Sequence, residues 1–415
     1  MALVQTMRAH PPSPKPLSRG EFIALLGVLF ATIAFSIDAM LPALPQIAAE
    51  LSPDRVTLAQ LVLTSFVLGL GIGTFLAGPL SDHFGRKPVI IAGGLLYIAG
   101  AMLAYFAPSL ELILAARVVQ GLGAAGPRVV SLAMVRDLYS GRAMAQVISF
   151  AMLVFTLFPA VAPLMGAAII AGFGWRAIFA AFICFAVFSV GWLWLRQPET
   201  LLRSARVSLN PGSLWSGARE ALAHKQMQLS ILCQTLVFGA LFATISSIQQ
   251  VFEFSYGRAE SFPVYFALIA LCASPAAPLN GWLVARLGMR PLIRRALVAQ
   301  TVLSITMAVL LATAILGSAE FWTYLAWSVT IFAMLGFTVG NLNTLALEPL
   351  GHIAGLASSL MGGLATVGGA ALGAAVGQLF DGSALPLALA CAVLSGAAAL
   401  LMRNMPREGR AEPAS

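Results

Sequence analysis

Long runs of apolar residues that almost lack charge are the feature that most restricts how this chain can fold. Residues 56–80 contain no charged side chain, and residues 89–116 contain only Glu111. Each run exceeds the roughly 20 residues that a helix needs to cross the hydrocarbon core of a bilayer. Only 10% of the 415 residues are charged, against about 25% in soluble domains. The pattern therefore predicts an all-α membrane protein.

Twelve such segments follow one another along the chain. They lie at roughly 21–45, 56–80, 89–107, 110–135, 144–171, 174–196, 228–251, 262–285, 291–317, 320–346, 353–379 and 383–403. We therefore predict twelve transmembrane helices. Small residues crowd the eleventh segment, where glycines such as Gly362, Gly363, Gly368 and Gly369 allow membrane helices to approach closely.

The positions of the Lys and Arg residues give the direction of these helices. With the N-terminus inside, nineteen of the 24 cations fall on the inside, three fall outside (Arg55, Arg176 and Arg258) and two fall within a helix. Because positively charged loops stay in the cytoplasm, both termini are expected there. The net charge of +8 follows from these loops, so no nucleic-acid partner is expected. The first apolar run is longer than a signal-peptide core, which favours a membrane helix over a cleaved signal.

The chain divides into two halves around one polar stretch. We predict a cytoplasmic N-terminal tail (1–20), a first six-helix bundle (21–196), a cytoplasmic linker (197–227), a second six-helix bundle (228–403) and a cytoplasmic C-terminal tail (404–415). An internal repeat supports this division, because residues 281–291 match residues 78–88 at five positions with a shift of 203 residues. The repeat predicts two pseudo-symmetric bundles in which Ala285 replaces Asp82.

Residues 78–88 read Gly-Pro-Leu-Ser-Asp-His-Phe-Gly-Arg-Lys-Pro and form a charged turn between the second and third apolar segments. The turn resembles the signature G-x-L-a-D-r-x-G-r-k of the major facilitator superfamily, whose members move small solutes across membranes. We expect a conformational latch at the cytoplasmic face, in which Asp82 engages the positive N-terminal end of a helix from the other half. The alternative is a loop that only sets orientation. The residues of the expected latch are Gly78, Asp82, Gly85, Arg86 and Lys87.

Asp38 is the only acidic residue that the pattern places well inside a membrane helix. An ionisable group costs about 2.5–3.5 kcal/mol or more in that position, so it normally faces a cavity and has a function. The alternative is that the first helix ends early and that Asp38 caps its outer end. The stretch Asp38-Ala-Met-Leu-Pro-Ala-Leu-Pro resembles the D-x-x-L-P-A-L-P stretch of drug:proton antiporters in the same superfamily. The resemblance makes Asp38 the first candidate for a protonation site.

The fourth segment carries Arg117 and Arg128. They are 11 residues apart, close to three helical turns, so both are expected on one face with Gln120, turned toward a central cavity. Residues 117–125 resemble the family's helix 4 motif R-x-x-Q-G-x-G-a-a, whose arginine is implicated in proton coupling. Arg117 is therefore expected to act with Asp38, and Gln120 and Arg128 to line the substrate cavity. In the alternatives, Arg117 extends to the outer interface and Arg128 reaches the inner one.

The fifth segment contains Phe158-Pro-Ala-Val-Ala-Pro-Leu-Met-Gly166. Prolines 159 and 163 each remove a backbone donor and are expected to bend this helix. Pro163 and Gly166 resemble the antiporter motif g-x-x-x-G-P-x-x-G-G, which departs here at Ala162 and Ala167. The stretch is more similar to the P-A-x-A-P-x-x-G form of the bicyclomycin-resistance (Bcr/CflA) subfamily. The family associates the motif with exporters, and the alternative is a bend that serves packing alone.

Other classes of function find no support in the sequence. The four cysteines lie inside apolar runs without metal-site spacing, and there is neither a Walker A string nor a catalytic or metal-binding cluster. We expect no enzyme activity, no metal and no cofactor, with the proton gradient as the source of energy. A receptor that does not transport would not need the polar residues of the first and fourth segments.

The resemblance implies drug:proton antiport by alternating access across a bacterial inner membrane. We expect the protein to work as a monomer in the lipid bilayer, with protons and a small drug or metabolite as partners. The alternative is a proton-coupled importer or exporter of a metabolite. One acid beside one or two arginines favours neutral, zwitterionic or anionic amphiphiles, such as amphenicol- or bicyclomycin-like drugs, over quaternary ammonium dyes.

Overall fold

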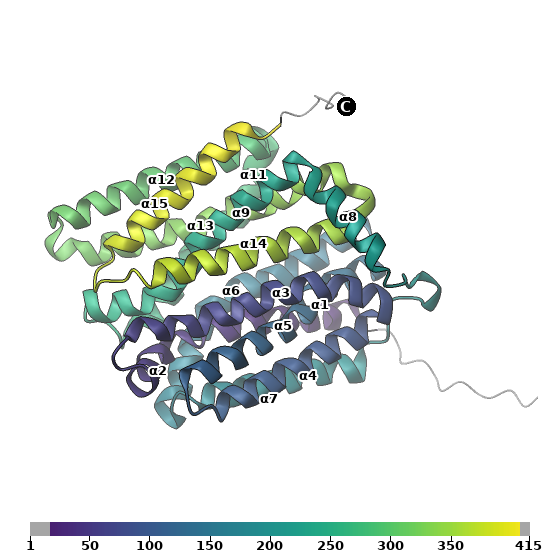
Figure 1. The fold of residues 1–415 in the computed structure, drawn as a ribbon, viewed down its shortest axis with the longest axis horizontal. Helices are drawn as coiled ribbons and strands as arrows, with labels where there is room; N and C mark the ends of the chain where they lie inside the picture. The colour runs from purple at the N-terminus through teal and green to yellow at the C-terminus, as the bar shows by residue number, and fades with distance from the viewer. Residues whose placement is uncertain (1–16, 407–415) are drawn as a thin grey trace, which may run out of the picture.

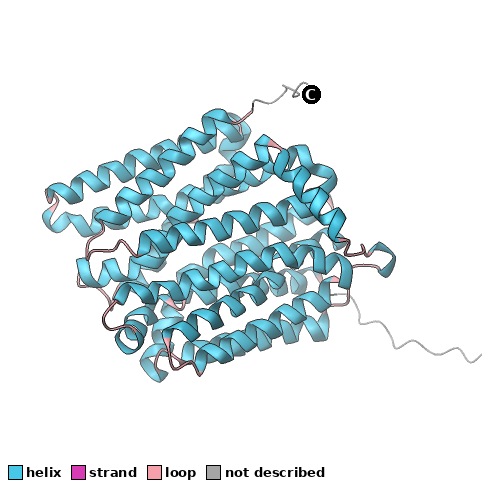
Figure 2. Ribbon diagram, viewed as in Figure 1, coloured by secondary structure: helices cyan, strands magenta, loops and turns pink. Residues whose placement is uncertain are grey.

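The computed structural model describes residues 17–406, except for the side chains of Ala145 and Thr156. Over that range the chain is helical with short connections and contains no strand (Figure 2). Eleven continuous helical stretches are long and apolar enough to cross a membrane, and one of them, Gly317–Gly377, contains two consecutive spans. The prediction of an all-α protein with twelve transmembrane helices is therefore confirmed.

The helices of the first half follow the predicted segments closely. They are α1 (Arg19–Asp38), α2 (Leu44–Leu51), α3 (Leu61–Phe84), α4 (Arg86–Tyr105), α5 (Leu110–Leu138), α6 (Gly141–Phe173) and α7 (Ala177–Arg196). Short 3-10 turns at Leu41–Ala43 and Val56–Gln60 precede α2 and α3. Six membrane spans result, because α1 and α2 form one helical stretch, Arg19–Leu51.

The second half repeats this plan after a short helix, α8 (Pro211–Ala223). Its helices are α9 (Lys225–Gln250), α10 (Phe262–Ala273), α11 (Ala276–Leu287), α12 (Met289–Thr313), α13 (Glu320–Leu347), α14 (Ala354–Gly377) and α15 (Leu385–Leu401). Helices α10 and α11 together make one span, Phe262–Leu287. A π-helical turn, Val251–Ser255, extends α9.

The helices run side by side in two groups (Figure 1). Helices α1–α7 fill the lower part of the view and α9–α15 the upper part, with α8 at the right. The two groups meet through α3 against α14 and through α6 against α10. We call the end of the molecule that carries α8 the linker end, and the end that carries α2 the distal end (Figure 1).

The charged turn is shorter than predicted. Helix α3 continues to Phe84 and α4 begins at Arg86, so Gly85 alone separates them. Gly85 has φ 108° and ψ 158°, and Gly288 between α11 and α12 has φ 78° and ψ 160°. Such positive φ values favour glycine, which lacks a Cβ atom. The two repeats therefore share one backbone conformation at the matching helix pair.

The first helix is interrupted where the sequence predicted a continuous segment over 21–45. Helix α1 ends at Asp38, and the chain resumes helical structure in the 3-10 turn Leu41–Ala43 and in α2. Pro42 and Pro45 explain the break, because a proline has no N–H to donate to the carbonyl four residues before it. The carbonyl of Asp38 is the first to lose its donor in this way.

Glycines allow helices to approach closely within the first half and between the two halves. A Cβ atom at Gly121 of α5 would collide with the Phe66 carbonyl of α3, and one at Gly123 with the Gly93 carbonyl of α4. In α14, a Cβ at Gly363 would lie 2.6 Å from the ring of Phe75 in α3. These contacts confirm that the small residues of the eleventh segment serve close packing, as membrane helices require in the absence of a hydrophobic driving force.

The glycine contacts can be tested by adding one methyl group at two positions. Gly121→Ala is expected to destabilise the fold by about 1–3 kcal/mol, because α3 and α5 must separate to admit the new atom. Gly191→Ala is the control, since nothing lies within 4 Å of that position in α7. Thermal unfolding in detergent should show a lower Tm for Gly121→Ala alone. Equal Tm values for both variants would contradict the packing described here.

Candidate functional site

Asp38 occupies the break between α1 and the following 3-10 turn. It is the last residue of α1, and only 5% of its surface is exposed. No hydrogen bond or ion pair to its carboxyl group occurs within residues 17–406. The early end of the helix agrees with the alternative that the sequence left open, but the span continues to Leu51 and Asp38 is buried. The protein thus holds a carboxyl group without a partner inside its membrane region.

Helix α6 packs directly on this break. A Cβ atom at Gly166 would collide with the carbonyl of Ala39, the residue that follows Asp38. About two helical turns earlier in α6, the ring of Phe158 contacts Phe35 edge-to-face at a centroid distance of 6.0 Å. Pro159 and Pro163 lie between these contacts, inside the helix. The stretch that resembles the antiporter motif therefore forms one wall beside Asp38, and its role in exchange stays a prediction.

Arg117 lies beside the start of α3 and is 0% exposed. Its guanidinium donates to the Ser36 carbonyl of α1 at 2.8 Å and to the Val62 carbonyl of α3 at 3.1 Å. It also donates to Oε1 of Gln120 at 2.7 Å and lies 4.4 Å from the ring centroid of Phe66. The alternative in which Arg117 extends to the membrane interface is therefore wrong. The side chain joins α1, α3 and α5 instead.

Arg117 makes no ion pair with Asp38. Its bond to Ser36 ends two residues before the acid, so the two predicted coupling residues are neighbours through the backbone of α1. The Ser36 hydroxyl in turn contacts the Tyr97 hydroxyl of α4 at 2.6 Å. Ser36 and Tyr97 belong to this site although the sequence reasoning did not select them. The sequence feature that could have identified both residues is a hydroxyl group within an otherwise apolar stretch.

The predicted cavity residues differ in their surroundings. Gln120 is 0% exposed, and its Nε2 has no hydrogen-bond partner among the described residues. Arg128 is half-buried in the part of α5 nearer the linker end and makes no hydrogen bond, ion pair or ring contact within residues 17–406. Arg117 and Arg128 therefore have different surroundings, since Arg117 is satisfied by protein groups and Arg128 makes none of these contacts.

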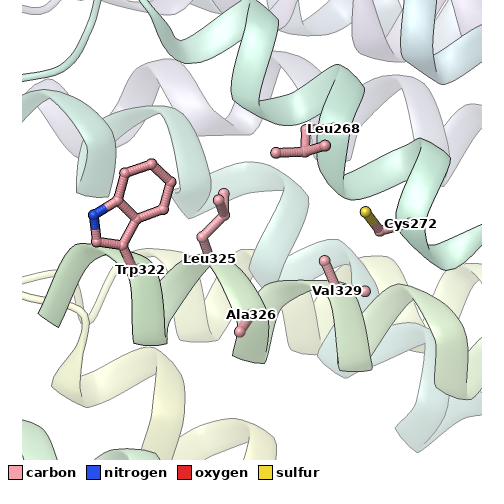
Figure 3. Close-up of a pocket in the computed structure, with 6 residues that line it drawn as sticks. All are labelled: Leu268, Cys272, Trp322, Leu325, Ala326 and Val329. Carbon is pink, nitrogen blue, oxygen red and sulfur yellow. The ribbon is translucent and has the colours of Figure 1, made fainter. Parts of the chain in front are cut away.

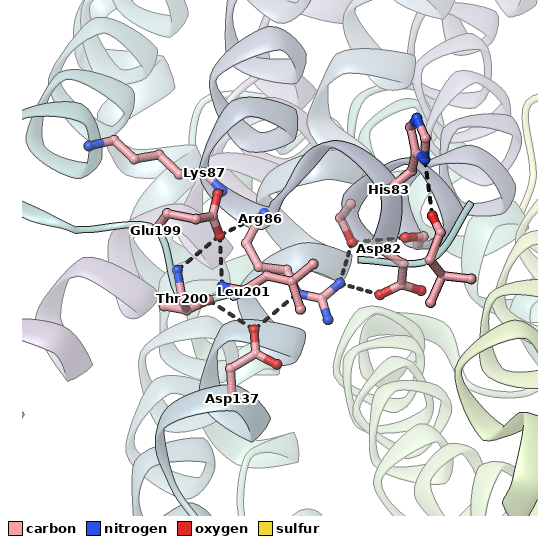
Figure 4. A network of polar contacts seen from close by, with 11 residues as sticks. Asp82, His83, Arg86, Lys87, Asp137, Glu199, Thr200 and Leu201 are labelled. Atoms are coloured by element: carbon pink, nitrogen blue, oxygen red, sulfur yellow. Dashed lines mark hydrogen bonds and ion pairs between the residues drawn. The ribbon is translucent and has the colours of Figure 1, made fainter. Parts of the chain in front are cut away.

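A second polar network surrounds the single-residue turn at the linker end (Figure 4). Arg86 pairs with Asp82 and, through its Nε, with Asp137 of α5 at 3.0 Å. Glu199 accepts hydrogen bonds from the backbone N–H groups of Arg86 at 3.0 Å and Lys87 at 3.1 Å. A carboxylate at the start of α4 interacts favourably with the helix dipole. Sequence reasoning missed Asp137 and Glu199, which are close to Arg86 only in the folded chain.

The N-terminal end of α4, which Glu199 contacts, belongs to the first half. The predicted latch instead requires Asp82 to contact the N-terminal end of a helix from the second half. The partners of Asp82 are Arg86 and the N–H of Val207, which donates to the Asp82 carbonyl at 3.0 Å. Gly78 does face the other half, since a Cβ there would lie 2.7 Å from the Ser359 hydroxyl of α14. The latch role of Asp82 stays a prediction.

One groove in the second half is apolar. It measures about 330 Å³ between α10 and α13 and is lined by Leu268, Cys272, Trp322, Leu325, Ala326 and Val329 (Figure 3). None of these residues lies on α1, α5 or α6, which carry the predicted site. Within residues 17–406 no group of His, Cys, Asp and Glu side chains is placed to hold a metal ion.

Comparison with known proteins agrees with the fold and with the motifs. The model of the Major Facilitator Superfamily matches residues 24–374. The chain belongs to this superfamily. The fold is that of solved transporters in the same group, including a D-xylose-proton symporter with a TM-score of 0.72 at 14% identity, covering 93% of this chain and 98% of that one. The xylose transporter XylE from E. coli, in a partially occluded inward-open conformation, gives a TM-score of 0.70 at 13% identity, with coverage of 95% and 99%.

Two relatives with higher sequence identity than these transporters are named as drug-resistance proteins. A bicyclomycin resistance protein homolog from Haemophilus influenzae is 32% identical over 400 residues, covering 94% of this chain and 98% of that protein. A chloramphenicol resistance protein from Pseudomonas aeruginosa is 30% identical over 337 residues, with coverage of 80% and 76%. The resemblance to the Bcr/CflA-like drug exporters of the superfamily is thereby confirmed.

The different environments of the two arginines can be tested with one substitution at both sites. Arg117→Met leaves the Ser36 carbonyl, near the broken end of α1, without its donor and removes the additional donor from the Val62 carbonyl of α3. A buried acceptor left unpaired costs about 1–3 kcal/mol. Arg128→Met removes no hydrogen bond and is the matched control on the same helix. Thermal unfolding should give a markedly lower Tm for Arg117→Met only. A Tm for Arg117→Met at or above that of the unchanged protein would contradict a scaffolding role.

Proposed function

We propose that this protein exports small amphiphilic drugs from the cytoplasm in exchange for protons. The names of its relatives support this direction and class of substrate. The structural observation that carries the proposal is Asp38, a buried carboxyl group without a protein partner at a helix break. An ionisable group in this position normally belongs to a substrate or ion pathway. A proton taken from outside would neutralise Asp38 and drive the return of the empty carrier.

Arg117 supports this site without neutralising it. Its donors are used by two backbone carbonyls and Gln120, so Asp38 is free to exchange its proton. Because Arg117 holds the turn of α1 that contains Ser36, it positions the acid. Of the two predicted coupling residues, Asp38 would then carry the proton and Arg117 would position Asp38.

Alternating access requires two bodies and a defined orientation. We propose that residues 21–196 and 228–403 move as bundles joined by the linker 197–227. The linker end faces the cytoplasm of a bacterial cell, because the cations of the charged turn and of the linker lie at this end. The charged network of Asp82, Arg86 and Asp137 would then stabilise the inner face of the first bundle.

Arg128 narrows the class of substrate. It is a cation without a protein partner in the inner half of α5, so it is available to a carboxylate or another electron-rich group of a ligand. Together with the single acid Asp38, it favours neutral, zwitterionic or anionic amphiphiles over permanent cations. No observation in the structure favours the metabolite importer that the sequence left open.

Removal of the ionisable group at Asp38 should uncouple transport. Asp38→Asn is expected to reduce amphenicol resistance to the background level in a bacterial host stripped of its own efflux pumps. Inside-out vesicles with the variant should take up no amphenicol when a proton gradient is imposed. Asp381→Asn is the control, because that side chain lies in an exposed turn and bonds only to Ser383. Expression of each variant is checked by immunoblot.

Two results would contradict the proposal. Full proton-driven uptake by Asp38→Asn at normal expression would exclude Asp38 as the proton carrier. Export of ethidium without any effect on amphenicols would exclude the proposed substrate class.

A further inference from the structure

Four hydrogen bonds between side chains of one half and groups of the other lie together at the distal end. They join the residues just before α3 to the end of α9 and to the residue after α14. This region is separated by the length of the helices from the charged network at the linker end (Figure 1). The inference drawn from these four bonds rests on the alternating access proposed above.

The first pair of bonds connects Gln60 with Gln250. Nε2 of Gln60 donates to Oε1 of Gln250, and Nε2 of Gln250 donates to the Val56 carbonyl at 2.9 Å. Both glutamines are buried, with 1% and 3% of their surface exposed. Burial makes these bonds expensive to leave unmade, because each freed amide would lose its partner in a site that excludes water.

The second pair connects Thr57 with Gln378. The Thr57 hydroxyl donates to Oε1 of Gln378 at 3.1 Å, and Nε2 of Gln378 donates to the Thr57 carbonyl at 2.9 Å. The neighbouring Gly377 allows this approach, since a Cβ there would collide with the Gln60 side chain. The second half therefore contacts the entry of α3 from two helices, α9 and α14, at one place.

An outer crevice begins at the same residues. A space of about 340 Å³ lies between the two halves, lined on one side by α2 and its flanking residues and on the other by Gln250, Glu253 and Phe254. Gln250 belongs both to this crevice and to the hydrogen-bonded cluster. Separation of the cluster would therefore extend the crevice into the space between the two halves.

We propose that Thr57, Gln60, Gln250 and Gln378 form the outer gate of the transporter. With the gate closed, the halves are held together at the distal end and the protein opens only toward the linker end. With the gate open, water in the crevice replaces the lost hydrogen bonds, and protons reach Asp38. The four gate residues are neutral, so protonation does not weaken the gate directly. A pH change acts on the carrier Asp38 and on Glu253, which lines the crevice beside Gln250, and the gate sets a constant preference for the closed outer face.

The proposal is tested by a distance measurement that needs no substrate. Spin labels at Asp54→Cys and Glu260→Cys, both exposed at the distal end, report the separation of the halves after Cys184 and Cys272 are replaced by alanine. Gln60→Ala with Gln378→Ala should raise the ratio of long to short distances roughly tenfold, because several inter-half hydrogen bonds are lost. The rise should be the same at pH 6 and pH 8. Gln228→Ala, which removes an amide at the other end of α9, is the matched control.

Gln378→Glu is a second, nearly isosteric variant. Its ionised carboxylate would face the Thr57 carbonyl and open the gate, whereas its protonated form can donate to that carbonyl and close it. The variant should therefore show long distances at pH 8 and shorter ones at pH 4, below the ordinary Glu pKa of about 4.3, relative to the unchanged gate at the same pH. The distance between the two spin labels is therefore expected to depend on pH in the glutamate variant and not in the alanine variants.

Two outcomes would overturn the proposal. One is an unchanged distance distribution in both gate variants, with Tm values showing that they fold. The other is an equal shift in Gln228→Ala. If the unchanged protein showed no drug transport, that result would contradict the proposed exporter function alone. The distance measurement would still test the gate.

Discussion

The three hydrogen bonds of Arg117 are the interaction on which the rest of the first half depends. Inside a membrane a guanidinium group finds no water, so protein groups must accept its hydrogen bonds. Ser36, Val62 and Gln120 provide the acceptors from α1, α3 and α5. These helices can come close enough to do so because Gly121 removes the side chain that would keep α3 and α5 apart. One buried cation thus fixes the relative positions of three helices.

This scaffold places Asp38 where it can exchange a proton. The acid follows Ser36 by two residues, at the point where Pro42 ends the hydrogen-bond ladder of α1. Gly166 brings α6 against the same break. The fixed parts of the first half therefore surround one ionisable group that has no fixed partner. Motion between the halves, with the amide gate at one end and the charged network at the other, would decide which side of the membrane supplies its proton.

The sequence predicted those features that follow from local patterns. Apolar runs predicted the helices, and the repeat around Gly85 and Gly288 predicted two related halves, because each signal lies within a few consecutive residues. The partners of Arg117 and Arg86 could not be predicted in this way, since Val62 and Glu199 reach them only through packing of distant helices. The break after Asp38 was present in Pro42 and Pro45, and the apolar pattern around these prolines concealed it.

Asp38 is the group that we propose to lose its proton when a drug is bound. The most direct measurement adds an amphenicol to purified protein in weakly buffered solution and follows the pH with an indicator dye. The unchanged protein should release protons on binding, and Asp38→Asn should release none while calorimetry still detects the drug. Equal proton release by both proteins, or binding to the unchanged protein without any release, would contradict the central role of Asp38.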